Sequence, residues 1–175
     1  MLEGSLVTID AMGTQTAIAE QIVRQGRGYL LAVKGNHETV MQDLADLFAG
    51  CDEIGFADVP HDKAETINKG HGRIEIRRCQ TLFAPEHLAY VRRHDDWKGL
   101  TTLIRIQRER HVDGQSSTET AYYISSCAAP AGFFLNAARN HWAIENQLHW
   151  SLDVTFREND NQTRVGFAAQ NLAVI

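Results

Sequence analysis

Apolar and polar residues follow two kinds of spacing over the first 60 positions. Residues 5–10 are a short run rich in β-branched side chains, which predicts a buried strand. Residues 15–25 repeat apolar side chains at helical spacing. A second buried strand is predicted over residues 29–33, followed by a helix that Asn36 caps and Gly50 ends. Strand, helix, strand and helix in this order predict a parallel α/β unit.

Beyond residue 60 the pattern changes to short segments that alternate polar and apolar side chains. Residues 73–77 and 103–110 alternate, and residues 118–125 are the returning strand after the turn signal at residues 113–114. Residues 85–91 favour one short helix, and helical spacing returns after residue 132 and continues to residue 150. We predict an α/β fold in three parts, which are the start of a core (1–59), a β-rich insertion (60–130) and a helical part of the core (131–175).

Composition and charge narrow the class of protein. An apolar content of 43% in 175 residues is enough for one sizeable core. No stretch reaches the roughly 18 to 20 apolar residues of a membrane span, so we expect a cytoplasmic protein. The net charge is −5, but residues 62–111 hold 11 of the 17 basic and 7 of the 22 acidic residues, which makes that segment +4 and the rest −9. Such a basic block fits a phosphate-contacting surface or a mixed solvated one.

Two carboxylates are candidate metal ligands. Asp10 ends the first predicted strand, where open α/β sheets present functional groups, although a helix or turn cap is an alternative role. Glu145 lies between His141 and His149 on one stripe of the last helix, where a satisfied histidine or a surface ion pair would give the same spacing. Together, two such carboxylates can hold divalent cations that activate a water or a 3′-hydroxyl.

Four blocks of sequence carry a resemblance to a known family. In order and spacing, residues 7–15, 29–36, 71–75 and 141–156 resemble the ISAs-type insertion-sequence transposases, a DDE-type group that includes the H-repeat-associated proteins. The resemblance implies a ribonuclease-H-like core interrupted by a β-rich insertion, and Mg²⁺- or Mn²⁺-dependent DNA cleavage and strand transfer.

The resemblance also implies roles for the two carboxylates. Asp10 matches the second metal-binding acid of the family and Glu145 the third. The first acid belongs to a block that would lie before Met1, so we expect this chain to be inactive alone. The implied partners are double-stranded DNA, as transposon ends and target, and a second copy of the protein. We expect association with the bacterial nucleoid when the protein is on DNA.

Further residues are predicted to contact DNA. Lys34 and Asn36 follow the second strand, near the expected active-site edge. The basic insertion and the last helix supply the remaining candidates, which are His71, Arg73, Arg77, Arg78, His141, Trp142, Asn146 and His149. Solvated strand charges and a core tryptophan are the simpler interpretations.

Two other functions stay open at this stage. One is a catalytically dead module that binds DNA or a protein partner. The other is a zinc hydrolase that uses His141, Glu145 and His149, although this spacing is not the HExxH arrangement of the known metalloproteases.

Overall fold

A computed structural model describes residues 4–70 and 72–144 of the chain. The chain divides into two compact units, Met1–Arg139 and Asn140–Ile175. The strands are β1 (Leu6–Ile9), β2 (Gly28–Val33), β3 (His61–Gly70), β4 (Arg73–Leu82), β5 (Thr102–Val112) and β6 (Gln115–Ser125). The α-helices are α1 (Thr16–Arg24), α2 (Glu38–Glu53), α3 (Pro85–Tyr90) and α4 (Ala131–Ile144), and the short 3₁₀ turns are η1 (Ala11–Gly13), η2 (Gly35–His37) and η3 (His94–Asp96).

One six-stranded sheet organises the first unit. Its strand order is β1-β2-β6-β5-β4-β3. The β1 and β2 strands are parallel, with Leu6 opposite Gly28 and Ile9 opposite Leu31, and the crossover between them contains α1. All other neighbours are antiparallel. The predicted parallel unit is therefore confirmed, and the fold is mixed α/β, with the strands of residues 61–125 in the same sheet as β1 and β2.

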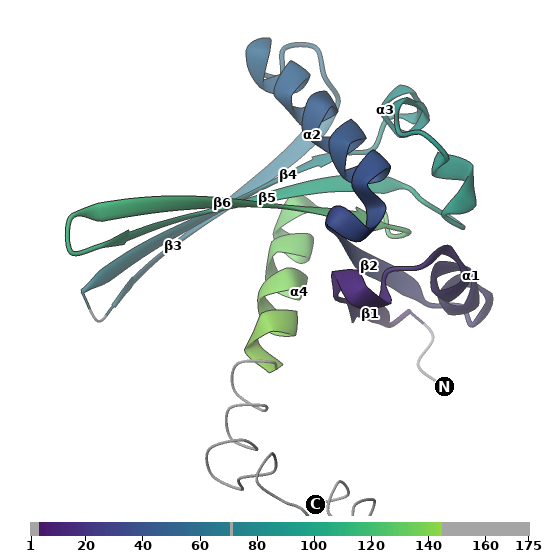
Figure 1. The fold of residues 1–175 in the computed structure, drawn as a ribbon, viewed down its shortest axis with the longest axis horizontal. Helices are drawn as coiled ribbons and strands as arrows, with labels where there is room; N and C mark the ends of the chain where they lie inside the picture. The colour runs from purple at the N-terminus through teal and green to yellow at the C-terminus, as the bar shows by residue number, and fades with distance from the viewer. Residues whose placement is uncertain (1–3, 71, 145–175) are drawn as a thin grey trace, which may run out of the picture. The chain divides into compact units, whose positions relative to one another are not determined.

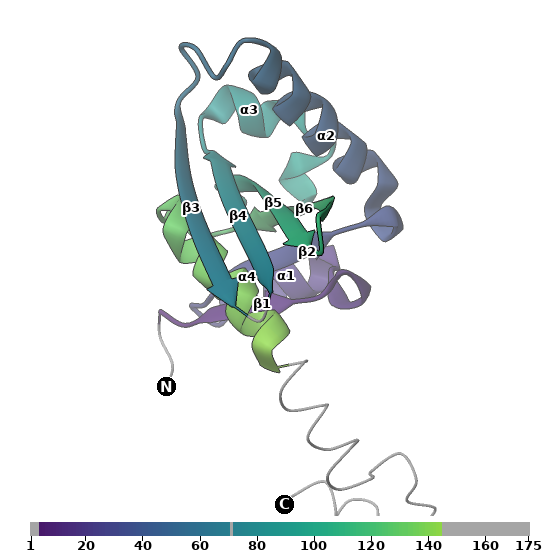
Figure 2. The same cartoon turned by 90° about the vertical axis from the view of Figure 1, so that its left-hand side faces the viewer.

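Apolar side chains on the two faces of the sheet form two cores. On one face, Leu31, Leu103 and Ile124 pack with Leu44 and Phe48 of α2, and with α1. On the opposite face the sheet packs against α4, and this second core is made by Leu30, Cys79, Ile104, Ile106, Tyr123, Ala131, Phe134, Leu135 and Ala138. Figures 1 and 2 show α2 and α3 on one side of the sheet and α4 on the other.

Two long hairpins extend the sheet past the helices, as Figure 1 shows. In the first, His61 of β3 lies opposite Leu82 of β4. The second pairs β5 with β6 and turns at Asp113 and Gly114, whose φ angles are 50° and 77°. Two successive positive φ angles are what a two-residue hairpin turn with Asp-Gly requires. The turn predicted at residues 113–114 is confirmed.

Three boundaries differ from the sequence prediction. The second helix continues through Gly50 to Glu53, because the next residue, Cys51, is buried in the core and offsets the poor helix propensity of glycine. His37, and not Asn36, occupies the N-cap position of this helix and makes no side-chain capping bond, while the Asn36 side chain donates to the Ala11 carbonyl oxygen. The first hairpin is longer than predicted because most of β3 is polar at an edge of the sheet, where alternation is weak. Among the described helices, none is long and apolar enough to cross a membrane.

Candidate active site

Asp10 and Lys34 lie together at the carboxyl edge of the parallel pair of strands. Asp10 directly follows β1 and Lys34 directly follows β2, and parallel strands end at the same edge of a sheet. The Lys34 Nζ atom is 3.8 Å from Asp10 Oδ1, and the two side chains are 56% and 49% exposed. The two residues thus lie at one edge of the sheet, and the carboxylate is half exposed.

The turn after Asp10 fixes the direction of its carboxylate. Asp10 Oδ1 accepts a hydrogen bond from the Ala11 amide at 2.5 Å, and the Gly13 amide donates to the Asp10 carbonyl oxygen at 3.0 Å. Gly13 is needed here, since a Cβ at this position would lie 2.7 Å from Ile9 Cγ2. Asp10 thus caps the η1 turn, as the alternative interpretation proposed. Its second oxygen, Oδ2, has no hydrogen-bond or ion-pair partner among the described residues.

Three side chains hold this turn in place: that of Thr14, at the end of the turn, and those of Asn36 and His37 in η2. The buried Thr14 hydroxyl donates to the Ala32 carbonyl oxygen at 2.8 Å and lies 3.2 Å from the Asp10 carbonyl oxygen. The Asn36 amide nitrogen donates to the Ala11 carbonyl oxygen. His37 Nε2 lies 2.6 Å from the Thr14 carbonyl oxygen. Three such links to one turn reduce its conformational freedom, which suits a site that must be ready before its ligand binds.

A tryptophan packs against His37, one of the three side chains that brace the Asp10 turn. The His37 ring meets the Trp97 ring edge-on at a centroid distance of 5.1 Å, and Trp97 is 3% exposed. Edge-to-face pairs of this kind add roughly 0.5–1.5 kcal/mol beyond burial of area when both rings are aromatic. His37 and Trp97 were not predicted from the sequence as parts of the site, because 60 positions separate them and no local pattern joins them.

Met12 is the other feature that sequence reasoning missed. Its side chain is 89% exposed, two positions after Asp10. Single exposed apolar residues are common, but this one projects from the braced turn. The local Ala-Met-Gly sequence gave no signal, because exposure of the middle residue follows from the 3₁₀ turn that Gly13 allows.

Several predicted site residues fall outside the part of the chain that the structure describes. They are His71, Glu145, Asn146 and His149. His141 and Trp142 are described, with ring centroids 6.3 Å apart and Trp142 41% exposed. They belong to the second unit. Within residues 4–70 and 72–144, no three His, Cys, Asp or Glu side chains gather closely enough to hold a metal ion.

The predicted arginines separate onto two faces of the sheet. Arg73 and Arg77 share the face of Cys79, which packs toward α4, whereas Arg78 points to the opposite face. There Arg78 pairs with Glu65 at 2.7 Å and with Glu109 at 2.9 Å. DNA binding by Arg78 stays a prediction, and any phosphate would have to compete with two carboxylates.

Asp10 lies at the carboxyl edge of parallel strands, which is where open α/β sheets present their functional groups. A family model described as "Transposase DDE domain" matches residues 1–175. The chain belongs to this family of DDE transposases, and the resemblance found in its sequence is confirmed.

Curated relatives agree with this assignment. Two proteins of Escherichia coli K12, "Putative protein YbfL" and "H repeat-associated putative transposase YhhI", are each 38% identical over 173 residues, covering 97% of this chain and 44% of their own length. "Putative transposase YncI" of Escherichia coli O157:H7 is 34% identical over 178 residues, covering 99% of this chain and 44% of its own length. The chain therefore spans less than half the length of these relatives. No solved structure matches it.

Proposed function

We propose that this chain forms part of the catalytic centre of a transposase that cleaves and joins DNA, with Asp10 and Glu145 as metal-binding carboxylates. The observation that carries the proposal is the state of Asp10. It is half exposed, braced by its own turn and has one oxygen free among the described residues. Carboxylate oxygen is the donor that Mg²⁺ and Mn²⁺ prefer. When bound, such an ion would activate the attacking hydroxyl and stabilise the leaving oxygen of a phosphodiester.

Lys34 is proposed to bind a DNA phosphate next to this carboxylate. Its ammonium group already lies within 3.8 Å of Asp10 Oδ1, and it is more than half exposed. A lysine is a compact point charge on a flexible stem, which allows it to turn from a carboxylate toward a nearby phosphate. Asn36 is instead proposed to position the site, since its amide nitrogen is engaged with the Ala11 carbonyl oxygen.

The ribonuclease-H-like core, the β-rich insertion and double-stranded DNA as the partner are proposed together. Family membership and the mixed α/β sheet support them. His141, Trp142, Asn146 and His149 are proposed to contact the transposon end. A second copy of the protein is proposed as a partner, because an element has two ends and each must be cleaved and joined to the target.

A chimera would test the catalytic proposal. The region of YhhI that matches this chain would be replaced by the 175 residues, with unmodified YhhI as the reference, and cleavage of DNA carrying the element's ends would be followed with Mg²⁺ or Mn²⁺. We expect Asp10→Asn and Glu145→Gln to reduce cleavage at least 100-fold, since each removes a cation ligand. Asp46→Asn, an exposed acid of α2 hydrogen-bonded to Gln42, is the control and should retain it. Full cleavage by Asp10→Asn would refute the assignment.

A further inference from the structure

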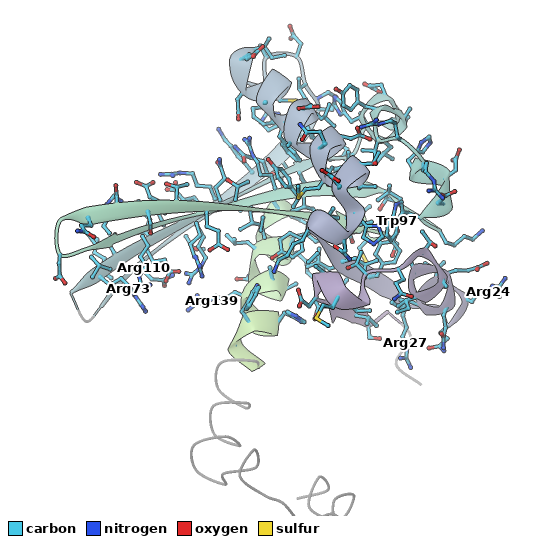
Figure 3. The ribbon with its side chains drawn as sticks, in the orientation of Figure 1. Arg24, Arg27, Arg73, Trp97, Arg110 and Arg139 are labelled. Carbon is cyan, nitrogen blue, oxygen red and sulfur yellow. The ribbon has the colours of Figure 1, made fainter. Side chains whose placement is uncertain are left out.

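The two long hairpins carry a row of arginines on one face only. Side chains alternate between the faces of a strand, so the residues that share a face with Cys79 and Ile106 follow from the pairing. Toward the turns of the hairpins, the residues on this face include Arg73, Arg77, Arg108 and Arg110. Arg139, in α4, belongs to the same side. We call these five residues the arginine face, and Figure 3 shows Arg73, Arg110 and Arg139 on the side of the hairpins toward α4.

The register brings these arginines close together. Arg77 lies directly opposite Arg108, and Arg110 lies opposite Glu75. Arg139 lies close enough to act on Arg77 as well. Burial lowers the pKa of the Arg77 guanidinium, the negative charge of Glu75 raises it, and the positive charges of Arg139 and Arg108 lower it further. Cations this close repel each other unless anions lie between them.

The arginine face holds more cations than carboxylates. Glu75 pairs with Arg77 at 2.7 Å and lies 3.9 Å from Arg108, which also binds Glu119. These two acids against five arginines leave a local charge of +3. The other three arginines, Arg73, Arg110 and Arg139, are exposed and have no ion pair with any residue that the structure describes.

The opposite face of the same hairpins is arranged differently. Arg78 is paired with two glutamates, and the buried Arg105 is paired with Asp52 at 2.5 Å. Its remaining basic residues, Lys63 and Lys69, are exposed on β3. The excess of unpaired arginine is therefore a property of one face and not of the basic segment as a whole.

We propose that the arginine face binds the phosphodiester backbone of duplex DNA without reading its base sequence. The distal parts of β3 to β6 carry no aromatic side chain on this face, so a stacking platform of the kind that holds single strands is lacking there. Instead, Ser117 lies opposite Arg110, and both line an open hollow of about 400 Å³ near the β5–β6 turn. Arginine and hydroxyl donors of this kind are the usual partners of phosphate oxygens.

The spacing of the arginines suits a duplex backbone. Two residues along a strand advance about 6.8 Å, which separates Arg108 from Arg110, and four residues advance about 14 Å, which separates Arg73 from Arg77. Successive phosphates of one DNA strand advance about 3.4 Å along the helix axis. The face therefore spans roughly four base pairs. The inference takes DNA as the partner from the proposed function, but it requires neither Asp10 nor a metal ion.

The salt dependence of DNA binding by the 175-residue chain tests this proposal. Fluorescence anisotropy with a 25-base-pair duplex of arbitrary sequence would compare Arg73→Ala/Arg110→Ala/Arg139→Ala with wild type between 50 and 200 mM salt. Each lost phosphate contact lowers the slope of log K against log salt by about 0.9, so the triple variant should lose about 2.7 of the slope. Wild type should then lose about 40-fold more affinity than the variant over this fourfold rise in salt.

Two further variants make the outcome decisive. Lys63→Ala/Lys69→Ala/Lys98→Ala removes the same charge from exposed positions outside the arginine face and should keep the wild-type slope. Replacing the three arginines with lysine should also keep most of it, and remains informative if the alanine variant folds poorly. Equal slopes for both alanine triples, or tighter binding to polyglutamate than to the duplex, would overturn the proposal. This assay measures binding without a divalent cation and the chimera measures cleavage with one, so failed cleavage by the chimera and failed binding by this face are separate results.

Discussion

Thr14→Val removes one hydroxyl that joins the Asp10 turn to the neighbouring strand. Thr14 is 1% exposed, and valine has nearly the same shape, so the change deletes a hydrogen bond without leaving a large cavity. The lost bond to the Ala32 carbonyl oxygen, 2.8 Å long, costs about 1 kcal/mol, and the acceptor left behind adds a desolvation cost of similar size. We expect the free energy of unfolding to fall by about 2 kcal/mol.

Urea and thermal unfolding would measure this effect, with Thr14→Ser as the control. A loss of 2 kcal/mol lowers the melting temperature by about 4–8 °C in a chain of this size. Serine keeps the hydroxyl and loses one buried methyl group, which costs about 1 kcal/mol. Hydrogen exchange of the Ala11 to Gly13 amides should speed up in the valine variant more than in the serine variant. A valine variant within 0.5 kcal/mol of wild type, or more stable than the serine variant, would refute the proposed role of this bond.

Two other predictions concern the ion pairs around α2. Asp52→Ala leaves the 4%-exposed Arg105 without its carboxylate and should cost about 2 kcal/mol, less than the roughly 3–5 of a fully buried pair because Asp52 is half exposed. Adding Arg105→Met should recover much of the lost free energy of unfolding, as measured with urea. A double variant as unstable as the single one would contradict this. The hydrogen bonds from Arg105 lower the pKa of Asp52. Burial acts to raise the pKa of Asp43, but the hydrogen bonds from Arg92 outweigh burial, so the pKa of Asp43 is lowered as well. Since both folded-state pKa values are below the unfolded one near 3.9, their contribution is complete above about pH 4 and is lost as pH falls through the folded values. The stability of Asp52→Asn should therefore fall less than that of wild type between about pH 4 and 2, and parallel curves would count against the assignment.

The sequence predicted the parallel unit well because its strands are buried on both sides. Leu30 and Leu31 of β2 face different cores, so the run is apolar throughout and easily distinguished from the helices beside it. Polar β3 gave a weaker signal, and its full length was found only through its pairing with β4. The Asp10 position was predicted from the end of a strand, since a strand end is a local feature.

The surroundings of Asp10 and the arginine face could not be predicted in the same way. The brace depends on contacts between residues far apart in the chain, such as Asn36 with Ala11 and His37 with Trp97. Arg108 and Arg110 were visible as part of a basic segment, but the choice of face depends on register. A shift of one residue would move every side chain to the other face, so the grouping with Arg77 follows only from the observed pairing.

The most direct test of the central claim is to map where a divalent cation binds. Fe²⁺ in place of Mg²⁺, with ascorbate and peroxide, generates radicals that cut the backbone beside the bound ion, and mass spectrometry locates the cuts. We predict cuts at residues 9–12 and near Glu145, suppressed by excess Mg²⁺ and lost in Asp10→Asn but not in Asp46→Asn. Cuts that fall elsewhere, or that persist unchanged in Asp10→Asn, would contradict the assignment of Asp10 as a metal-binding carboxylate.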